Sequence, residues 1–348
     1  RAWKRGHMQR IFGHTRRLRF ADAPARAAQL AAQANAPVLA WAGRVTPALE
    51  AETTARAVPL VRVEDGFLRS RGLGAQLVPP LSLVRDDLGI YYDPTRHSRL
   101  EHLITAAPAL PDASTHRARS LIDRLTRARL SKYNLPRPLP DLPPGHRILV
   151  PGQVEDDASI RLGCTTVATN LDLLRHARAA NPGAILVYKP HPDVEAGLRP
   201  GRLSGSDCEG LADVIATEAD PIGLIEACDS IWTMTSLMGF EALIRGKPVT
   251  CLGAPFYAGW GLTGQAIPLP TDVAARRQAR PTLEQLAHAV LIDYPRYIDP
   301  VTGNACPVEV VVDRLENAPA RAHRPGPALR LLARMQGALA GHAGLWRR

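Results

Sequence analysis

The chain has 348 residues, 45% of them hydrophobic and 22% charged, which is enough apolar sequence for a sizeable core divided between two domains. The formal net charge is +10, but the basic residues are dispersed and no helix-turn-helix, RRM or zinc-finger pattern occurs, so no nucleic-acid partner is expected. No spanning apolar segment, no signal peptide and no CxxC pair among the five cysteines is found, so we expect a cytoplasmic protein that is soluble or peripheral to a membrane. The chain begins with Arg1, which suggests a module excised from something longer.

The first half of the chain has the pattern of an α/β domain. Short apolar runs predict buried strands over 38–41 and 59–63, on either side of an alanine-rich helix over 47–57. The segment 135–144 contains five prolines, which exclude a helix or a central strand. We therefore predict a first domain over residues 1–144 that ends in this linker.

The second half alternates strands and helices more regularly. Strands are predicted over 147–150, 185–188, 231–234 and 249–252, with helices over 170–180, from 221 and over 237–245. Asp220 before Pro221 is typical of a helix start, and Gly246 is typical of a helix end. A parallel doubly wound sheet over 145–318 is therefore expected, and the predicted fold class is α/β with two Rossmann-like domains facing across a cleft.

Four polar clusters follow predicted strands, where such domains bind ligands. They lie at 63–70, 152–159, 187–193 and 235–243. The third contains Lys189 and His191, and the fourth breaks into Thr235-Ser236 at a helix start. A cation, an imidazole and free backbone N–H groups at neighbouring strand ends indicate a phosphate site.

Some of these clusters also have a purely structural interpretation. Glu64-Asp65 is compatible with a turn and a helix cap, Asp156-Asp157 with an N-terminal cap, and Ser236 with an ordinary N-cap. The flanking prolines fix the backbone of His191 and keep it off any helical face, which favours a ligand role. No Walker, zincin or Asp-x-Asp motif occurs, so the site is predicted to handle phosphate without a metal.

Several segments together carry a resemblance to a known family. The chain resembles the KpsC family, called LipB in some loci, of retaining β-Kdo transferases in bacterial capsular polysaccharide biosynthesis. The resemblance extends over nearly the whole chain, and its motifs are RVEDGFLRS at 62–70, PPLSLV at 79–84, GIYYD at 89–93, SKYN at 131–134, QVEDDASI at 153–160, KPHPD at 189–193 and GFEAL through GWGLT at 239–263.

The resemblance implies a GT-B-like enzyme that transfers Kdo, a sugar acid, from CMP-β-Kdo. The implied acceptor is a β-Kdo linker on a (lyso)phosphatidylglycerol glycolipid at the inner membrane, and the implied mechanism is double displacement with retention. No cofactor or metal is expected. Members carry two such modules in tandem, and this chain is more similar to the second, so a second module is expected in the full-length protein.

The resemblance also implies roles for individual residues. It assigns the nucleophile to Asp157, with Asp156 as a neighbour that is easily confused with it. Recognition of the CMP phosphate falls on Lys189 and His191. The remaining donor-binding residues are Gln153, Thr235, Ser236 beside the phosphate and Glu241 at the ribose hydroxyls. Glu64 is expected to activate the acceptor or act as acid or base, and Arg69 to bind a Kdo or acceptor carboxylate.

Alternatives remain open at this point. An inverting CMP-sugar transferase with Asp157 or Glu64 as general base would carry similar motifs, as would a non-catalytic protein that binds a sugar nucleotide or a polyanion. Residues 319–348 predict a basic amphipathic helix, which either lies on the anionic inner leaflet or packs on the body of the protein.

Overall fold

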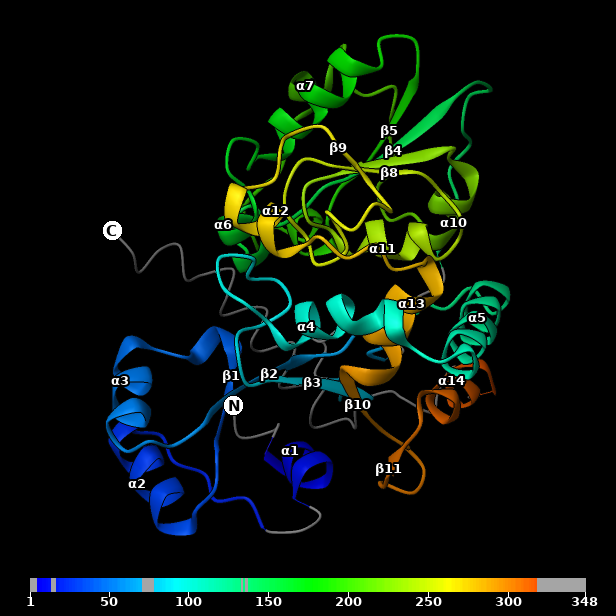
Figure 1. The fold of residues 1–348 in the computed structure, drawn as a ribbon. Helices are drawn as coiled ribbons and strands as arrows, with labels where there is room; N and C mark the ends of the chain where they lie inside the picture. Colours follow the sequence, from blue (N-terminus) through cyan, green and yellow to red (C-terminus); the bar gives the residue numbers. More distant parts are fainter. Residues whose placement is uncertain (1–4, 14–16, 71–77, 133, 135–136, 318–348) are drawn as a thin grey trace.

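The computed structural model describes residues 5–13, 17–70, 78–132, 134 and 137–317. The helix predicted over 319–348 lies outside the described residues. Figure 1 shows two layered α/β units, one above the other, with α4 (Arg99–Ala106) between them.

The upper unit is built on a six-stranded sheet in which every pairing is parallel, in the order β6-β5-β4-β7-β8-β9. Its strands are β4 (Arg147–Pro151), β5 (Ile185–Lys189), β6 (Val214–Ile215), β7 (Ser230–Thr233), β8 (Val249–Cys251) and β9 (Gly264–Gln265). Its helices are α6 (Ala158–Gly163), α7 (Asn170–Ala180), α8 (Pro192–Glu195), α9 (Gly205–Cys208), α10 (Pro221–Ala227), α11 (Leu237–Leu243) and α12 (Thr271–Arg276). The predicted parallel sheet is confirmed.

Local sequence explains where these helices begin and end. Asp220 accepts hydrogen bonds from the backbone N–H groups of Ile222 and Gly223, and Pro221 occupies the first helical position of α10. Gly246 has a φ of 71°, the left-handed conformation that glycine adopts without a steric penalty after a helix. Both predicted signals are confirmed.

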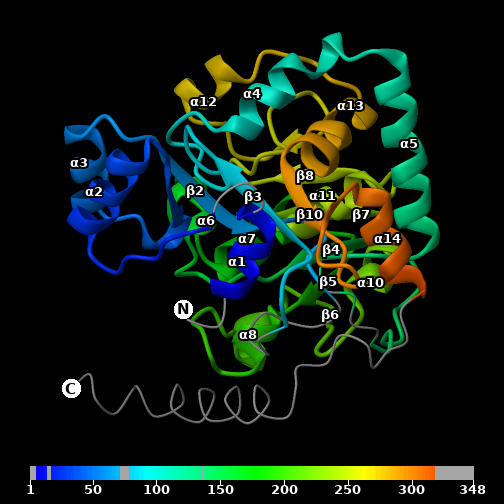
Figure 2. The ribbon, with the colours of Figure 1, turned by 90° about the horizontal axis from the view of Figure 1, so that it is seen from below.

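The lower unit has a mixed five-stranded sheet in the order β1-β2-β3-β10-β11, in which β1 and β2 are parallel and the other neighbours antiparallel. Its strands are β1 (Val38–Trp41), β2 (Leu60–Asp65), β3 (Ser82–Asp86), β10 (Pro295–Ile298) and β11 (Ala305–Cys306). Its helices are α1 (Arg5–Phe12), α2 (Pro24–Ala34), η2 (Ala42–Arg44), α3 (Pro47–Ala55), α4, η4 (Ala107–Ala109), α5 (Asp112–Arg127), α13 (Leu283–His288), η5 (Ala289–Asp293) and α14 (Val308–Asn317). Figure 2 shows α2 and α3 at one end of this sheet and α5 and α14 at the other.

The end of the chain differs from the predicted division, which assigned everything from 145 to 318 to the second domain. β10 instead pairs with β3 of the first sheet, and the Tyr294 hydroxyl donates a 2.8 Å hydrogen bond to Asp86 beside it. Residues 283–317 therefore return to the first unit (Figure 1). β10 has four residues and begins with proline, so its sequence shows no periodicity that predicts a strand. That β3 has an edge on which β10 can pair is evident only from the folded sheet.

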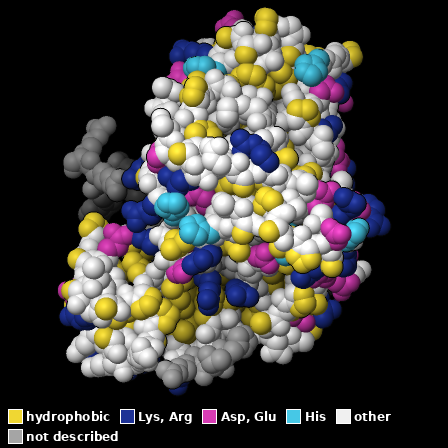
Figure 3. Space-filling model, viewed as in Figure 1, with side chains coloured by type: hydrophobic (Ala, Val, Ile, Leu, Met, Phe, Trp, Pro, Cys, Tyr) yellow, Lys and Arg dark blue, Asp and Glu magenta, His cyan; other side chains and the backbone are white. Residues whose placement is uncertain are grey.

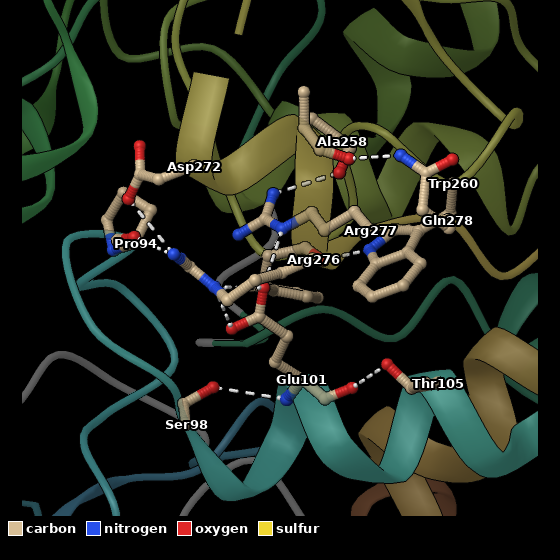
Figure 4. Close-up of polar contacts among 12 residues, drawn as sticks. Pro94, Ser98, Glu101, Thr105, Ala258, Trp260, Asp272, Arg276, Arg277 and Gln278 are labelled. Atoms are coloured by element: carbon tan, nitrogen blue, oxygen red, sulfur yellow. Dashed lines mark hydrogen bonds and ion pairs between the residues drawn. The ribbon is translucent and has the colours of Figure 1, made fainter. Parts of the chain in front are cut away.

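The two units are joined by a continuous apolar core and by a buried ionic cluster. Phe67, just after β2, packs against Phe256 of the upper unit, and their ring centroids are 5.0 Å apart. Glu101 on α4 is 6% exposed and pairs with Arg276 at 3.3 Å and with Arg277 at 3.4 Å (Figure 4). Arg277, itself 4% exposed, also donates to the backbone oxygens of Pro255 and Ala258. These contacts fix how the upper unit sits on the lower one.

Candidate functional site

Three of the four predicted clusters meet because β5, β4 and β7 are parallel neighbours. These strands end at Lys189, Pro151 and Thr233, and their carboxyl ends lie at one edge of the sheet. The segments that follow carry most of the residues predicted to bind or react with the donor. The structure thus brings together Lys189, His191, Gln153, Asp157, Thr235 and Ser236.

Lys189 and His191 form the hydrogen-bond-donating side of this cluster. Lys189 is 4% exposed, its Nζ donates to the Pro190 backbone oxygen at 3.2 Å, and burial lowers its pKa. His191 is the N-cap of α8, where Nδ1 accepts a 3.1 Å hydrogen bond from the Asp193 N–H. This bond assigns the neutral tautomer in which Nε2 carries the proton.

Burial also lowers the pKa of His191, and the nearby Lys189 charge acts in the same direction, whereas Asp193 and Asp157 oppose the shift. The imidazole is therefore neutral at neutral pH. The two side chains present an ammonium and an N–H donor, a pair that suits a phosphate oxygen.

Gln153 connects the segments that follow β4 and β7. Its Oε1 accepts from the backbone N–H of Thr235 and its Nε2 donates to the Thr235 hydroxyl, both at 2.9 Å. Asn170, 1% exposed, holds the Gln153 backbone from the other side through two hydrogen bonds of 2.8 Å. Gln153 is therefore a link between the ends of β4 and β7, and its predicted contact with the donor stays a prediction.

Asp157 lies at the start of α6 with one carboxylate oxygen engaged. Oδ1 accepts from the backbone N–H of Ser159 at 2.9 Å and from its hydroxyl at 2.8 Å, and that hydroxyl lies 3.3 Å from the Thr235 hydroxyl. Within the described part of the chain, Oδ2 makes no hydrogen bond. A half-buried carboxylate fixed by one oxygen presents the other to a ligand.

The structure distinguishes Asp157 from its neighbour. Asp156 is exposed and forms an ion pair of 2.5 Å with Arg199 at the surface. Asp157 instead lies near enough to His191 to affect its pKa. Asp157 is therefore the one of the two aspartates that belongs to the group around His191, and its role as nucleophile stays a prediction.

The start of α11 contributes the last part of the cluster. The Ser236 hydroxyl accepts from the Met238 N–H at 3.2 Å, so Ser236 is the N-cap, and the Tyr257 hydroxyl donates to its backbone oxygen. A Cβ at Gly239 would lie 2.2 Å from that tyrosine oxygen, which is why α11 requires glycine there. Ser236 remains half-buried, and its neighbour Thr235 contacts Ser159 in the segment after β4.

Glu241 faces a different neighbour from the one predicted. Its carboxylate accepts from the backbone N–H of Lys132 at 3.0 Å, in the connection between the units, and burial raises its pKa, opposed mainly by the Arg245 charge. The side chain is 8% exposed. Glu241 therefore anchors this connection, and its role at the ribose hydroxyls stays a prediction.

The remaining predicted cluster, at 63–70, lies in the lower unit beside a large pocket. Glu64 and Arg69 line a cavity of about 920 Å³ together with apolar residues of β1, among them Leu39 and Trp41. Figure 3 shows this face of the lower unit as a hollow with hydrophobic side chains inside and Lys or Arg side chains beside it. A cavity of this size accommodates more than one sugar residue.

Arg69 already has hydrogen-bond partners among the residues beside this cavity. It is 1% exposed, and its guanidinium donates to Asp65 and to the Ser70 hydroxyl, both at 2.8 Å. The Asp65 N–H in turn donates to Glu64 at 3.0 Å. Arg69 therefore positions the acidic end of β2, and its predicted contact with a substrate carboxylate stays a prediction.

Sequence reasoning missed Asn170, which looks like an ordinary residue one position inside a helix capped by Thr169. Its partners, Gln153 and Gly201, are distant in the chain, so only its polar character at a buried helix start hinted at the role. In the described ranges, no group of three or more His, Cys, Asp or Glu side chains is placed to hold a metal, and no helix is long and apolar enough to cross a membrane. The expected absence of a metal stays a prediction.

Comparisons with known proteins agree with this architecture. The family model described as "Capsule polysaccharide biosynthesis protein" matches residues 37–142 and 143–297. The capsule polysaccharide modification protein LipA of Neisseria meningitidis serogroup B is 44% identical over 316 residues, 90% of this chain and 44% of that protein. The chain thus spans less than half the length of this relative.

Two solved structures are similar over most of the chain. A KpsC of Thermosulfurimonas dismutans described as a β-Kdo 2,7 transferase matches with a TM-score of 0.73 and 34% identity, covering 91% of this chain and 96% of that one. A second from the same organism, described as a β-Kdo 2,4 transferase, matches with a TM-score of 0.71 and 36% identity, covering 80% and 86%. The predicted GT-B-like fold class is confirmed by this likeness.

Proposed function

This chain belongs to the capsule polysaccharide biosynthesis family that includes the KpsC transferases, and we propose that it is a retaining β-Kdo transferase with CMP-β-Kdo as donor. The observation that carries the proposal is the placement of Asp157 beside Lys189 and His191 at the ends of β4 and β5. A nucleophile and a phosphate site must be neighbours, because the bond that breaks joins the sugar to the phosphate of CMP.

The first step is attack by the Asp157 carboxylate on the anomeric carbon. The bond from this carbon to the CMP phosphate oxygen breaks, and its electron pair leaves with CMP, whose growing negative charge Lys189 and the His191 N–H stabilise. Oδ2 is the attacking atom, since Oδ1 accepts two hydrogen bonds from Ser159. Configuration inverts once.

In the second step the acceptor hydroxyl attacks the same carbon from the face that CMP has left. Its proton passes to Glu64, and Asp157 departs as a carboxylate, so the product has the configuration of the donor. The pocket that Glu64 lines offers room for the acceptor, a β-Kdo linker on a (lyso)phosphatidylglycerol glycolipid. We propose that the protein acts in the cytoplasm at the inner membrane, where a net charge of +10 favours an anionic surface.

Intact-protein mass spectrometry after incubation with CMP-β-Kdo tests the mechanism. We expect a mass gain of one Kdo that disappears in Asp157→Ala and persists in the matched control Asp156→Ala. Product with the donor's configuration but no adduct would contradict double displacement, product with inverted configuration would favour an inverting transferase, and binding without turnover would favour a sugar-nucleotide binding protein.

A further inference from the structure

A loop of the lower unit, residues 90–94, is built to face the donor cluster of the upper unit. It closes as a turn in which the Asp93 N–H donates to the Ile90 backbone oxygen at 3.0 Å, and Asp93 then accepts from the N–H and hydroxyl of Thr95. These bonds fix the loop from its own side. The two tyrosines at its centre, Tyr91 and Tyr92, are not part of the mechanism described above.

The upper unit holds the same loop from above. The Arg276 guanidinium donates a 2.5 Å hydrogen bond to the Pro94 backbone oxygen, as Figure 4 shows, and its Nε pairs with Glu101. Pro94 also lies 4.0 Å from the position that a Cβ on Gly163 would occupy, at the end of α6. Because Asp157 caps the other end of this helix of six residues, the loop lies against the element that carries the proposed nucleophile.

Ring contacts orient the tyrosines within the loop. Tyr91 packs edge-on against Phe67 with 4.9 Å between centroids and against Phe256 at 5.9 Å, so it is anchored in the core that joins the units. Tyr92 packs edge-on against Tyr91 at 5.3 Å and stays half-buried. Tyr91 thus serves as the anchor and holds Tyr92 at the boundary between the units.

The surroundings of the Tyr92 hydroxyl connect the two units. Burial raises its pKa, and the negative charges of Glu64, from β2, and of Asp157 raise it further, so both carboxylates lie within electrostatic reach of one phenol. The hydroxyl keeps its proton at any ordinary pH and is a neutral hydrogen-bond donor. It makes no hydrogen bond to any residue that the structure describes.

We propose that Tyr92 is a further substrate-contacting residue of the transfer site, whose hydroxyl donates a hydrogen bond to the sugar held between Asp157 and the acceptor. The inference rests on the proposed function, because the transferred sugar must occupy the space between the nucleophile and the group that deprotonates the acceptor. In both steps the phenol keeps its proton. The bonds that form and break remain those at the anomeric carbon, and the acceptor proton still passes to Glu64.

Arg276 has a supporting part in this proposal as a positioning residue. It joins the loop to Glu101 and α12 and so fixes the position of Tyr92 relative to α6. A hydrogen bond that strengthens in the transition state acts on kcat and leaves donor affinity nearly unchanged.

The experiment compares Tyr92→Phe with the matched control Tyr91→Phe in the purified protein, using CMP-β-Kdo and a short β-Kdo acceptor. We expect kcat of Tyr92→Phe to fall by about 30-fold, as when one preorganised donor is removed, with the donor KM and Tm unchanged. The control, which loses a hydroxyl from the adjacent ring, should stay within about threefold of the wild type.

Each outcome is decisive. A wild-type kcat in Tyr92→Phe overturns the proposal, as does an equal loss in both variants with a lowered Tm, which would mean that the loop is merely structural. Absence of product with the wild-type protein itself would refute the proposed function, a result distinct from any difference between the two variants.

Discussion

The upper and lower units supply their polar residues to the site in different ways. In the upper unit, parallel neighbours β5, β4 and β7 end at one edge, so residues about forty positions apart in the chain converge by a single topological rule. In the lower unit, β2 is followed by antiparallel β3, and the Tyr92 loop beyond it reaches the other unit only through tertiary contacts. The donor side therefore follows from the order of the parallel strands, whereas the acceptor side depends on how the two units pack.

The largest expected effect concerns the nucleophile of the upper unit. Asp157→Asn keeps an N-cap side chain for α6 but removes the attacking carboxylate, so transfer should fall by at least about a thousandfold with normal folding. Steady-state kinetics of Kdo transfer measures this, with Asp156→Asn as control, since Asp156 pairs with Arg199 at the surface. A similar loss in both variants would remove the distinction between the two aspartates.

The same contrast explains how much the sequence alone could predict. Strands 38–41 and 185–188, the cap at Asp220 and the meeting of Lys189 with Asp157 followed from hydrophobic patterning and from the rule for parallel strand ends. The pairing of β10 with β3 did not, because a strand of four residues leaves no periodic signal. The partner of Glu241 was equally hidden, since a hydrogen bond to the backbone of Lys132, far away in the chain, has no local signature.

The second prediction tests the ionic cluster that joins the units. Glu101→Gln keeps the shape of the side chain but leaves the buried Arg277, which is 4% exposed, without its anionic partner. The free energy of unfolding should therefore fall by about 3 kcal/mol. Chemical denaturation measures the change. The control is Asp87→Asn, whose pair with Arg99 at the start of the same helix is exposed and should contribute less than about 1 kcal/mol.

Equal and small losses in Glu101→Gln and Asp87→Asn would mean that the cluster adds little to the apolar contacts between the units. The apolar contacts alone would then have to fix the position of the loop over residues 90–94. If Glu101→Gln instead lowers transfer far more than stability, the cluster acts mainly by alignment.

The third prediction separates donor from acceptor functions. His191→Asn preserves an N-cap acceptor for α8 but removes the Nε2 donor, so the Kd for CMP should rise by about tenfold, the value of one hydrogen bond to a phosphate. Isothermal titration calorimetry gives the affinity. Glu64→Gln in the lower unit should bind CMP like the wild type while losing transfer.

Weakened CMP binding in Glu64→Gln would contradict the assignment of donor and acceptor functions to separate units. Unchanged binding in His191→Asn would remove His191 from phosphate recognition. The two variants together therefore test the assignment from both sides.

The smallest expected effect is the pH dependence of CMP binding. Burial lowers the pKa of His191 in the free protein, and a bound phosphate dianion would favour its charged form and raise that pKa in the complex. Binding then takes up protons, so affinity should strengthen as pH falls from 8 to 6.5, by about two- to fivefold per unit. Calorimetry in buffers of different ionisation enthalpy measures the uptake directly, and above pH 6.5 the phosphate of CMP, with a second pKa of about 6, interferes little. His191→Asn should lose this pH dependence, whereas a wild-type affinity that is constant or rises with pH would show that the anion does not charge the buried imidazole.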